Sequence, residues 1–171
     1  METLFENRKD ASALCAIPRS TVRGPREILY LSLPFLPTTR LSRQKGWAED
    51  IPVALYHHSH HTDRLIFVSQ TAKTAGLHPD LSVADARARC LSAKFYPVAF
   101  EHDKACLSAL ARWCLRYTPL AGSNDVDCGI WLDLTGASHL FGGAPAVQAD
   151  VMAKLSGVGL EVHSALAPTY G

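Results

Sequence analysis

Hydrophobic and polar residues along the chain follow a pattern that predicts strands first, with helices between them. Residues 28–33 form an apolar run typical of a buried strand, and Pro34 and Pro37 end it because proline has no backbone N–H for a neighbouring strand. Two further apolar runs flank a histidine-rich stretch, which predicts a hairpin over about residues 53–69. Residues 1–25 keep no regular period, so a loose N-terminal extension is expected there.

Helical spacing follows the hairpin. Ser69 is placed to cap a short helix over residues 70–75, and Gly76 to end it. Ser82 and Asp85 have the spacing of a capping box and open a second short helix. A long amphipathic helix is expected from Asp103 onward, and its apolar face consists of Leu107, Leu110, Cys114 and Tyr117.

The last third of the chain returns to strands around one helix. An alternation with period two predicts a strand whose apolar face consists of Ile130, Leu132 and Leu134. Pro145 suits the first turn of the helix that follows, and Gly157 its end; the inner stripe consists of Val147, Val151 and Leu155. Residues 160–166 form the final strand. The whole order predicts an α+β fold, a mainly antiparallel sheet with helices on one face and a small unit inserted after the first strand.

Composition narrows the function classes. With 171 residues, 47% of them hydrophobic, the chain can bury a core, and 17 basic against 16 acidic residues give a net charge of +1. No overall positive field marks a nucleic-acid binder, so any DNA contact must be local. Arg40, Arg43 and Lys45 are a small basic cluster, expected in a solvated loop after the first strand.

Cysteine spacing and hydrophobicity indicate a soluble cytoplasmic protein. The cysteines are odd in number and contain no CxxC pair, which favours reduced thiols over disulfides; they are Cys15, Cys90, Cys106, Cys114 and Cys128. No apolar run approaches the roughly 20 residues of a spanning helix, and the polar start lacks the apolar core of a signal peptide.

Several segments in this order resemble one family. "ILYLSLPF", "LARWCLRYTPL", "GIWLDLTGASHLFGG" and "GLEVHSALAPTYG" are similar to segments of the Y-family (translesion, UmuC/DinB-like) DNA polymerases, and in particular of their inactive bacterial branch, ImuB. The likeness covers residues 26–171. It implies a polymerase palm with a small fingers subdomain inserted at about residues 45–100, in a chain that stops before the thumb.

The resemblance places the family's functional positions on unsuitable residues. In active members three carboxylates hold two Mg²⁺ ions, and their positions fall here on Ser32, Cys128 and Gly129. The aromatic residue that excludes ribonucleotides falls on Pro37. The fingers residues that hold the triphosphate fall on Gln70 and Lys73, and the lysine that follows the last strand falls on Tyr170. Together with Pro37 these are at most vestigial nucleotide or DNA contacts.

What the resemblance implies about function is therefore an accessory role without catalysis and without a cofactor. It implies a DNA repair and damage-induced mutagenesis system, the SOS response, with three partners: an error-prone replicative-type DNA polymerase, the sliding clamp and an ImuA-like protein. Damaged DNA is a further possible partner, and no membrane is involved.

Two alternatives remain open. Asp127 and Asp133 flank the site in sequence, so an active error-prone polymerase with relocated Mg²⁺ ligands is the first. Because side chains alternate along a strand, both aspartates are expected to point away from Cys128 and to share only the face of Gly129. Asp133 is interpreted as a hydrogen-bonded strand residue. The second is a small metal-binding protein that uses the stretch His57, His58, His60 and His61, in which His58 and His60 share a face.

Overall fold

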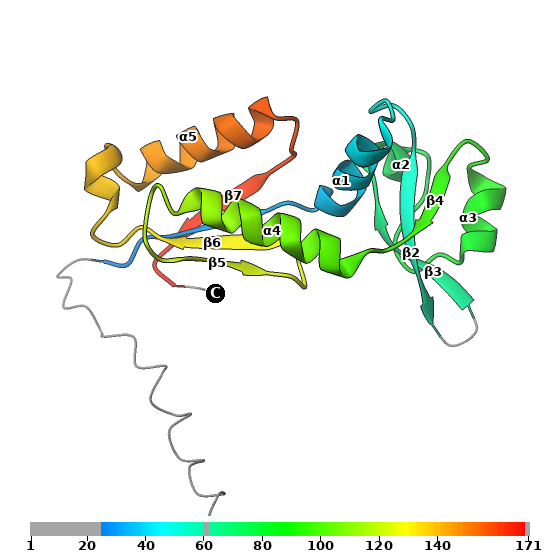
Figure 1. The fold of residues 1–171 in the computed structure, drawn as a ribbon, viewed down its shortest axis with the longest axis horizontal. Coiled ribbons are helices and arrows are strands. Elements are labelled where there is room, and N and C mark those ends of the chain that lie inside the picture. Colours follow the sequence, from blue (N-terminus) through cyan, green and yellow to red (C-terminus); the bar gives the residue numbers. More distant parts are fainter. Residues whose placement is uncertain (1–24, 60–61, 170–171) are drawn as a thin grey trace, which may run out of the picture.

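The computed structural model describes residues 25–59 and 62–169 (Figure 1). The strands are β1 (Ile28–Ser32), β2 (Val53–Ser59), β3 (Thr62–Val68), β4 (Lys94–Pro97), β5 (Ala121–Asn124), β6 (Gly129–Asp133) and β7 (His163–Ala167). The helices are α1 (Leu36–Lys45), α2 (Gln70–Thr74), α3 (Val83–Arg89), α4 (Phe100–Cys114) and α5 (Ala144–Gly157), with a 3-10 turn η1 (Ser138–Phe141). The N-terminal extension expected before β1 lies outside the described residues.

The larger sheet has the order β5-β6-β1-β7 and is antiparallel throughout. Its central strand β1 pairs with β6 on one side and with β7 on the other. Figure 1 shows α4 and α5 running along the same sheet, and their apolar residues share one core with it. Among the described residues the fold class is therefore the predicted α+β arrangement of a mainly antiparallel sheet and helices.

Alternation along β1 and β6 explains the layering. Leu29 and Leu31 are fully buried on the helix side, while Tyr30 and Ser32 point to the open face and are partly exposed. Ile130 and Leu132 repeat the pattern on β6. The helices contribute the other half of this core with Leu107, Ala111, Cys114, Val147, Val151 and Leu155.

A smaller unit lies between α1 and α4 in the chain and beside the larger sheet in space (Figure 1). Its sheet has the order β3-β2-β4, in which β2 is antiparallel to β3 and parallel to β4. Both predicted serine caps are present: Ser69 Oγ accepts from the backbone N–H of Ala72, and Ser82 Oγ accepts from that of Asp85. The unit has its own core around Ala54, Leu65 and Leu77.

The segment after β1 was predicted wrongly. Residues expected in a solvated loop form α1, and Pro37, expected to end a strand, lies in the first turn of this helix. Proline is accommodated there because the first N–H groups of a helix have no partner within the helix. Arg40, Arg43 and Lys45 therefore project from a helix whose other side, including Leu41, is buried.

Two short strands had no counterpart in the prediction. β4 has the sequence KFYP and β5 has the sequence AGSN, and neither alternates between apolar and polar residues. Each is formed by pairing with an established neighbour, β4 with β2 and β5 with β6. Helix α4 begins at Phe100, ahead of Asp103, and ends before Tyr117, and the last strand begins at His163 rather than at residue 160.

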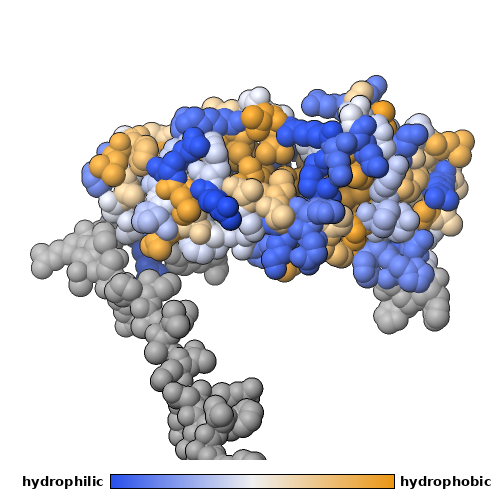
Figure 2. Space-filling view, in the orientation of Figure 1, coloured by the Kyte–Doolittle hydropathy of each residue, from blue (hydrophilic) through white to orange (hydrophobic). Residues whose placement is uncertain are grey.

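Figure 2 shows hydrophobic residues between α4 and α5, and hydrophilic ones over the N-terminal end of α4. Within the described part of the chain, none of the helices combines the length and hydrophobicity that a membrane crossing requires.

Replacing Leu132 by alanine is expected to lower the free energy of unfolding by about 2–5 kcal/mol, because it removes a fully buried side chain and leaves a cavity. Leu91, which is 93% exposed, is the matched control, and Leu91→Ala should change the value by no more than about 0.5 kcal/mol. Urea denaturation followed by circular dichroism measures both. Equal losses for the two variants would contradict the position of the core.

Candidate functional site

The end of β1 and the start of β6 meet at one point of the larger sheet. Ser32 lies directly opposite Gly129 in the antiparallel register, and Cys128 precedes Gly129 in the chain. The backbone N–H of Leu33 donates to the carbonyl of Cys128 at 3.0 Å, which continues the pairing past the end of the strands. The structure thus brings Ser32 next to Cys128 and Gly129, which lie almost a hundred residues further along the chain.

The side chain of Tyr30 covers Gly129. A Cβ atom built on Gly129 would overlap the Tyr30 hydroxyl and Cζ atoms and lie 2.9 Å from Cε2. A second aromatic residue of the open face, Trp131, lies over Gly122 of β5 in the same way, 2.5 Å from where a Cβ would be. Glycine at position 129 therefore leaves room for the tyrosine ring, and no larger side chain fits unless the ring moves.

Asp127 holds the ring of Tyr30 in place. The Tyr30 hydroxyl donates to Asp127 Oδ2 at 2.5 Å. Burial of the ring, followed by this hydrogen bond and the nearby negative charge of Asp127, raises the pKa of Tyr30 to about 12. At neutral pH the phenol is protonated, and Asp127 serves as its acceptor.

Asp133 lies at the opposite end of β6. It is paired in register with Ile28, four residues along β1 from Ser32, which at about 3.3 Å per residue is roughly 13 Å away. Asp133 Oδ1 accepts from the backbone N–H of Thr135 at 3.0 Å. The interpretation of Asp133 as a hydrogen-bonded strand residue is confirmed, whereas Asp127 does lie beside Gly129.

Cys128 is buried and has a positive φ of 51°, which is uncommon for a residue other than glycine. Burial raises the pKa of its thiol to about 11, and the negative charges of Asp103, Asp127 and Asp125 act in the same direction. A thiol with this pKa stays protonated at neutral pH, so it is not an activated nucleophile.

This set of residues does not fit a pair of Mg²⁺ ions. Mg²⁺ requires oxygen ligands, mostly carboxylates, and here the converging groups are a hydroxyl, a protonated thiol and a glycine. Of the carboxylates that act on Cys128, Asp127 accepts the Tyr30 hydrogen bond, Asp103 is paired with Arg40, and Asp125 is paired with Lys104. Within residues 25–59 and 62–169 no group of three or more His, Cys, Asp or Glu is arranged to hold a metal ion.

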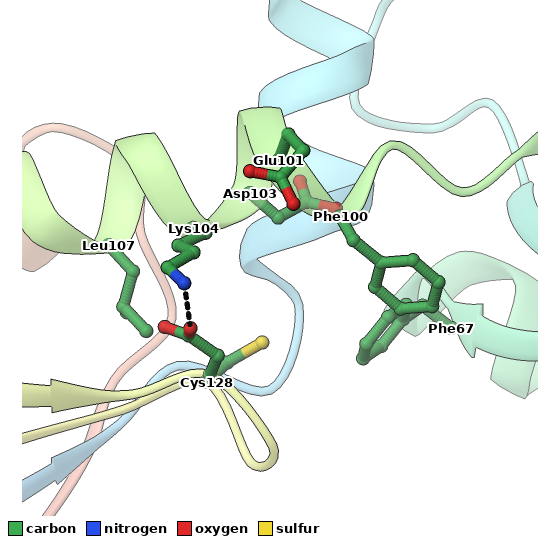
Figure 3. Close-up of a pocket in the computed structure, with 8 residues that line it drawn as sticks. Phe67, Phe100, Glu101, Asp103, Lys104, Leu107 and Cys128 are labelled. Atoms are coloured by element: carbon green, nitrogen blue, oxygen red, sulfur yellow. Dashed lines mark ion pairs between the residues drawn. The ribbon is translucent and has the colours of Figure 1, made fainter. Parts of the chain in front are cut away.

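A cavity of about 170 Å³ opens next to Cys128, between α4, the β5–β6 connection and β3 (Figure 3). Its lining consists of Phe67, Phe100, Glu101, Asp103, Lys104, Leu107, Asp125 and Cys128. Asp103 is only 7% exposed, and its Oδ1 atom lies 2.6 Å from Arg40 Nε on α1. Sequence reasoning missed this cavity because it exists only where the smaller unit meets the sheet; the acidic first turn of α4 was its visible signal.

A sequence profile described as the impB/mucB/samB family matches residues 36–170. The chain belongs to that family. The resemblance to the UmuC/DinB-like Y-family polymerases is thereby confirmed.

The chain is also similar to curated proteins named ImuB. The chain is 39% identical over 99 residues to the protein named ImuB from two strains of Caulobacter vibrioides, NA1000 / CB15N and ATCC 19089 / CIP 103742 / CB 15. The matched part is 56% of this chain and 21% of each relative. The match thus covers about a fifth of the length of these relatives.

Solved structures of family polymerases share the fold. An insertion ternary complex of Dbh DNA polymerase matches 84% of this chain and 43% of its own with a TM-score of 0.72 at 12% identity. DinB from Sulfolobus solfataricus matches 84% of this chain and 42% of its own with a TM-score of 0.70 at 12% identity. At such low identity the likeness shows the fold alone.

The remaining family positions are scattered around the junction of the two units. Pro37 is buried in the first turn of α1, and Gln70 is exposed at the start of α2. Lys73 reaches back towards the sheet, with its Nζ atom 5.4 Å from the centre of the Phe35 ring. The interaction that the structure shows for Lys73 is thus with an aromatic ring, and its role as a phosphate contact stays a prediction. Tyr170 lies outside the described residues.

The histidine stretch forms one pair with an acid. His58 Nδ1 lies 2.8 Å from Asp63 Oδ1 across the hairpin, and both side chains are well exposed. His60 and His61, and with them the expected pairing of His58 with His60, lie outside the described residues. A single exposed pair is typical of a solvated hairpin end.

Gly129→Ala is expected to destabilise the protein by about 1–3 kcal/mol, because the tyrosine ring must move and lose its bond to Asp127. Gly157 at the end of α5 has nothing within 4 Å of the position that a Cβ atom would take, so Gly157→Ala should be neutral or stabilising by up to about 1 kcal/mol. Thermal unfolding measures both. Tyr30→Ala combined with Gly129→Ala should cost less than the sum of the single changes, and strict additivity would contradict the overlap.

Alkaline pH is expected to destabilise the protein through Cys128. Its pKa is about 11 when folded and near 9.0 when unfolded, so the unfolded chain loses the proton first. The contribution of the buried, protonated thiol to the free energy of unfolding is complete below pH 9. It is lost as the pH rises through about 11, which lowers the free energy of unfolding by roughly 2–3 kcal/mol. Urea titrations between pH 8 and about pH 11 should show a shallower decline for Cys128→Ala than for the wild type. Identical slopes would rule this contribution out.

Proposed function

We propose that this chain is a non-catalytic, polymerase-like accessory module of DNA repair and damage-induced mutagenesis, of the ImuB type. The observation that carries the proposal is the position of the Tyr30 ring, which fills the space that a carboxylate at residue 129 would need. In the active branch of the family that carboxylate and two others hold the metal ions, and here serine and cysteine stand at the other two positions. The fold is retained while the metal site is not.

The retained parts of the fold support a scaffold role. The core beneath the site is complete, with Leu31 and Ile130 fully buried directly under Ser32 and Gly129. Helices α1 and α4, which flank the smaller unit in the chain, are also joined by Arg40 and Asp103, whose side chains are 16% and 10% exposed. A module that keeps its packing and loses its ligands can present a surface to other proteins without catalysing nucleotide transfer.

The proposed partners follow from the ImuB branch. They are an error-prone replicative-type DNA polymerase, the sliding clamp and an ImuA-like protein, brought together at damaged DNA. Because the chain matches about a fifth of the length of its curated relatives, we propose these partners for the whole ImuB-type protein. The cytoplasm of a bacterium inducing an SOS response is the proposed setting.

The absence of catalysis is tested by primer extension. The full-length protein, incubated with primer-template DNA, all four deoxynucleotides and either Mg²⁺ or Mn²⁺, should not extend the primer, because its donor groups cannot hold the ions. A Y-family polymerase such as Dbh serves as the positive control. Template-directed extension that Asp127→Ala abolishes would contradict the proposal and establish the relocated-ligand alternative.

The accessory role is tested in cells. Deleting the gene should lower the frequency of damage-induced mutations, whereas the combined changes Ser32→Ala and Asp127→Asn should leave that frequency at the wild-type level. A mutation frequency that falls equally in the deletion strain and in the double variant would show that the site itself is needed. Co-purification of the polymerase and clamp with the full-length protein after DNA damage is the accompanying measurement, and its failure would count against recruitment.

A further inference from the structure

The cavity beside Cys128 carries negative charge. Three carboxylates, those of Glu101, Asp103 and Asp125, line it together with one ammonium group, that of Lys104. Lys104 Nζ lies 3.5 Å from Asp125 Oδ2, the ion pair drawn as a dashed line in Figure 3. Asp103 is paired with Arg40 of α1, outside the lining, so three carboxylates face two basic groups and one negative charge is left over. The remaining lining is largely apolar and includes the rings of Phe67 and Phe100.

Asp103 provides an unused hydrogen-bond acceptor in this lining. Its Oδ1 atom is bound by Arg40, whereas its Oδ2 atom is buried and has no hydrogen-bond partner within residues 25–59 and 62–169. A buried carboxylate oxygen without a donor costs free energy, so a ligand that donates a hydrogen bond there is favoured. The first turn of α4 thus points to a ligand with N–H groups and a positive charge.

Two other kinds of ligand fit this lining poorly. A nucleoside triphosphate would bring its own negative charge next to Glu101 and Asp103 and would find one lysine, already paired with Asp125. A divalent metal ion would need several converging donors, and the described residues form no such group. A cation that also packs against aromatic rings satisfies both the charged and the apolar parts of the lining.

We propose that this cavity receives an arginine side chain of a partner protein. The guanidinium group is planar, stacks on aromatic rings and donates several hydrogen bonds, which matches the rings of Phe67 and Phe100 beside the carboxylates of Glu101 and Asp103. Lysine has neither the planar face nor the paired donors.

The surroundings of the opening favour a protein over a free small molecule. Phe100 lines the cavity and is 50% exposed. Exposed apolar side chains around an anchoring pocket are typical of a protein interface, where they exclude water from the buried ion pair. The inference rests on the proposed scaffold role, since it supplies that scaffold with a contact point for a partner.

The test is a titration of the ¹⁵N-labelled protein with N-acetyl-arginine amide, followed by amide chemical shifts. The amides of residues 100–107 and 125–128 should shift and saturate together. N-acetyl-citrulline amide, which has the same shape without the charge, should leave them unchanged. Glu101→Gln and Asp103→Asn should each raise Kd roughly fivefold or more. Glu161→Gln removes an exposed carboxylate outside the cavity lining and should have no effect.

Each result decides the inference. The inference would be overturned if these amides showed no saturating shifts with N-acetyl-arginine amide, or if Glu101→Gln left Kd unchanged. It would also be overturned if N-acetyl-citrulline amide or N-acetyl-lysine amide bound equally well. If dATP with Mg²⁺ shifted the same amides at lower concentrations than N-acetyl-arginine amide does, the cavity would be a nucleotide site and the inference would be overturned. Because Glu101 is exposed on a helix surface, its variant remains informative if Asp103→Asn fails to fold. Primer extension alongside intact arginine binding would remove the proposed scaffold role and leave the arginine site standing.

Discussion

The antiparallel pairing of β1 with β6 is the constraint on which the rest of the site depends. It sets Ser32 opposite Gly129 and Tyr30 opposite Trp131, so one register decides which side chains converge at the end of the sheet. Side chains alternate across a strand, and this register therefore buries Leu29 and Leu31 under the helices and directs Tyr30 to the open face. The tyrosine ring over Gly129 and its bond to Asp127 follow from the same pairing.

The contact between Tyr30 and Gly129 links the packing of the sheet to the proposed absence of a metal site. The resemblance to the polymerase family implies that active members carry a metal-binding carboxylate at the position of Gly129. Here the aromatic ring lies in that space and is held by a carboxylate from the neighbouring turn. A side chain at residue 129 would have to displace a packed and hydrogen-bonded ring, so a carboxylate introduced there would disturb the contacts between β1 and β6.

Local patterns in the sequence were sufficient for the elements whose signal is local. The alternation of Ile130 and Leu132 and the caps at Ser69 and Ser82 were predicted correctly, because each depends on residues within one turn or strand. Helix α1 was missed because Pro37 was interpreted as a strand end, although a first helical turn accommodates it equally well.

Contacts between distant segments could not be predicted in the same way. β5 has no alternation of its own and exists through its pairing with β6. The Tyr30–Asp127 hydrogen bond and the Arg40–Asp103 ion pair join residues 97 and 63 positions apart, so they require the folded chain. The convergence of Ser32, Cys128 and Gly129 was expected only through the resemblance to the polymerase family, and the register of β1 and β6 gives it a physical basis.

With serine, cysteine and glycine at the meeting point of β1 and β6, this end of the sheet is not expected to hold divalent cations, and Mn²⁺ is a sensitive probe of such binding. Paramagnetic Mn²⁺ broadens the amide resonances of nearby residues, so a titration of the ¹⁵N-labelled protein maps any site. We expect no saturable broadening of the amides of residues 32, 33 and 127–129, with or without a deoxynucleoside triphosphate. Saturable broadening confined to these residues, and reversed by excess Mg²⁺, would contradict it.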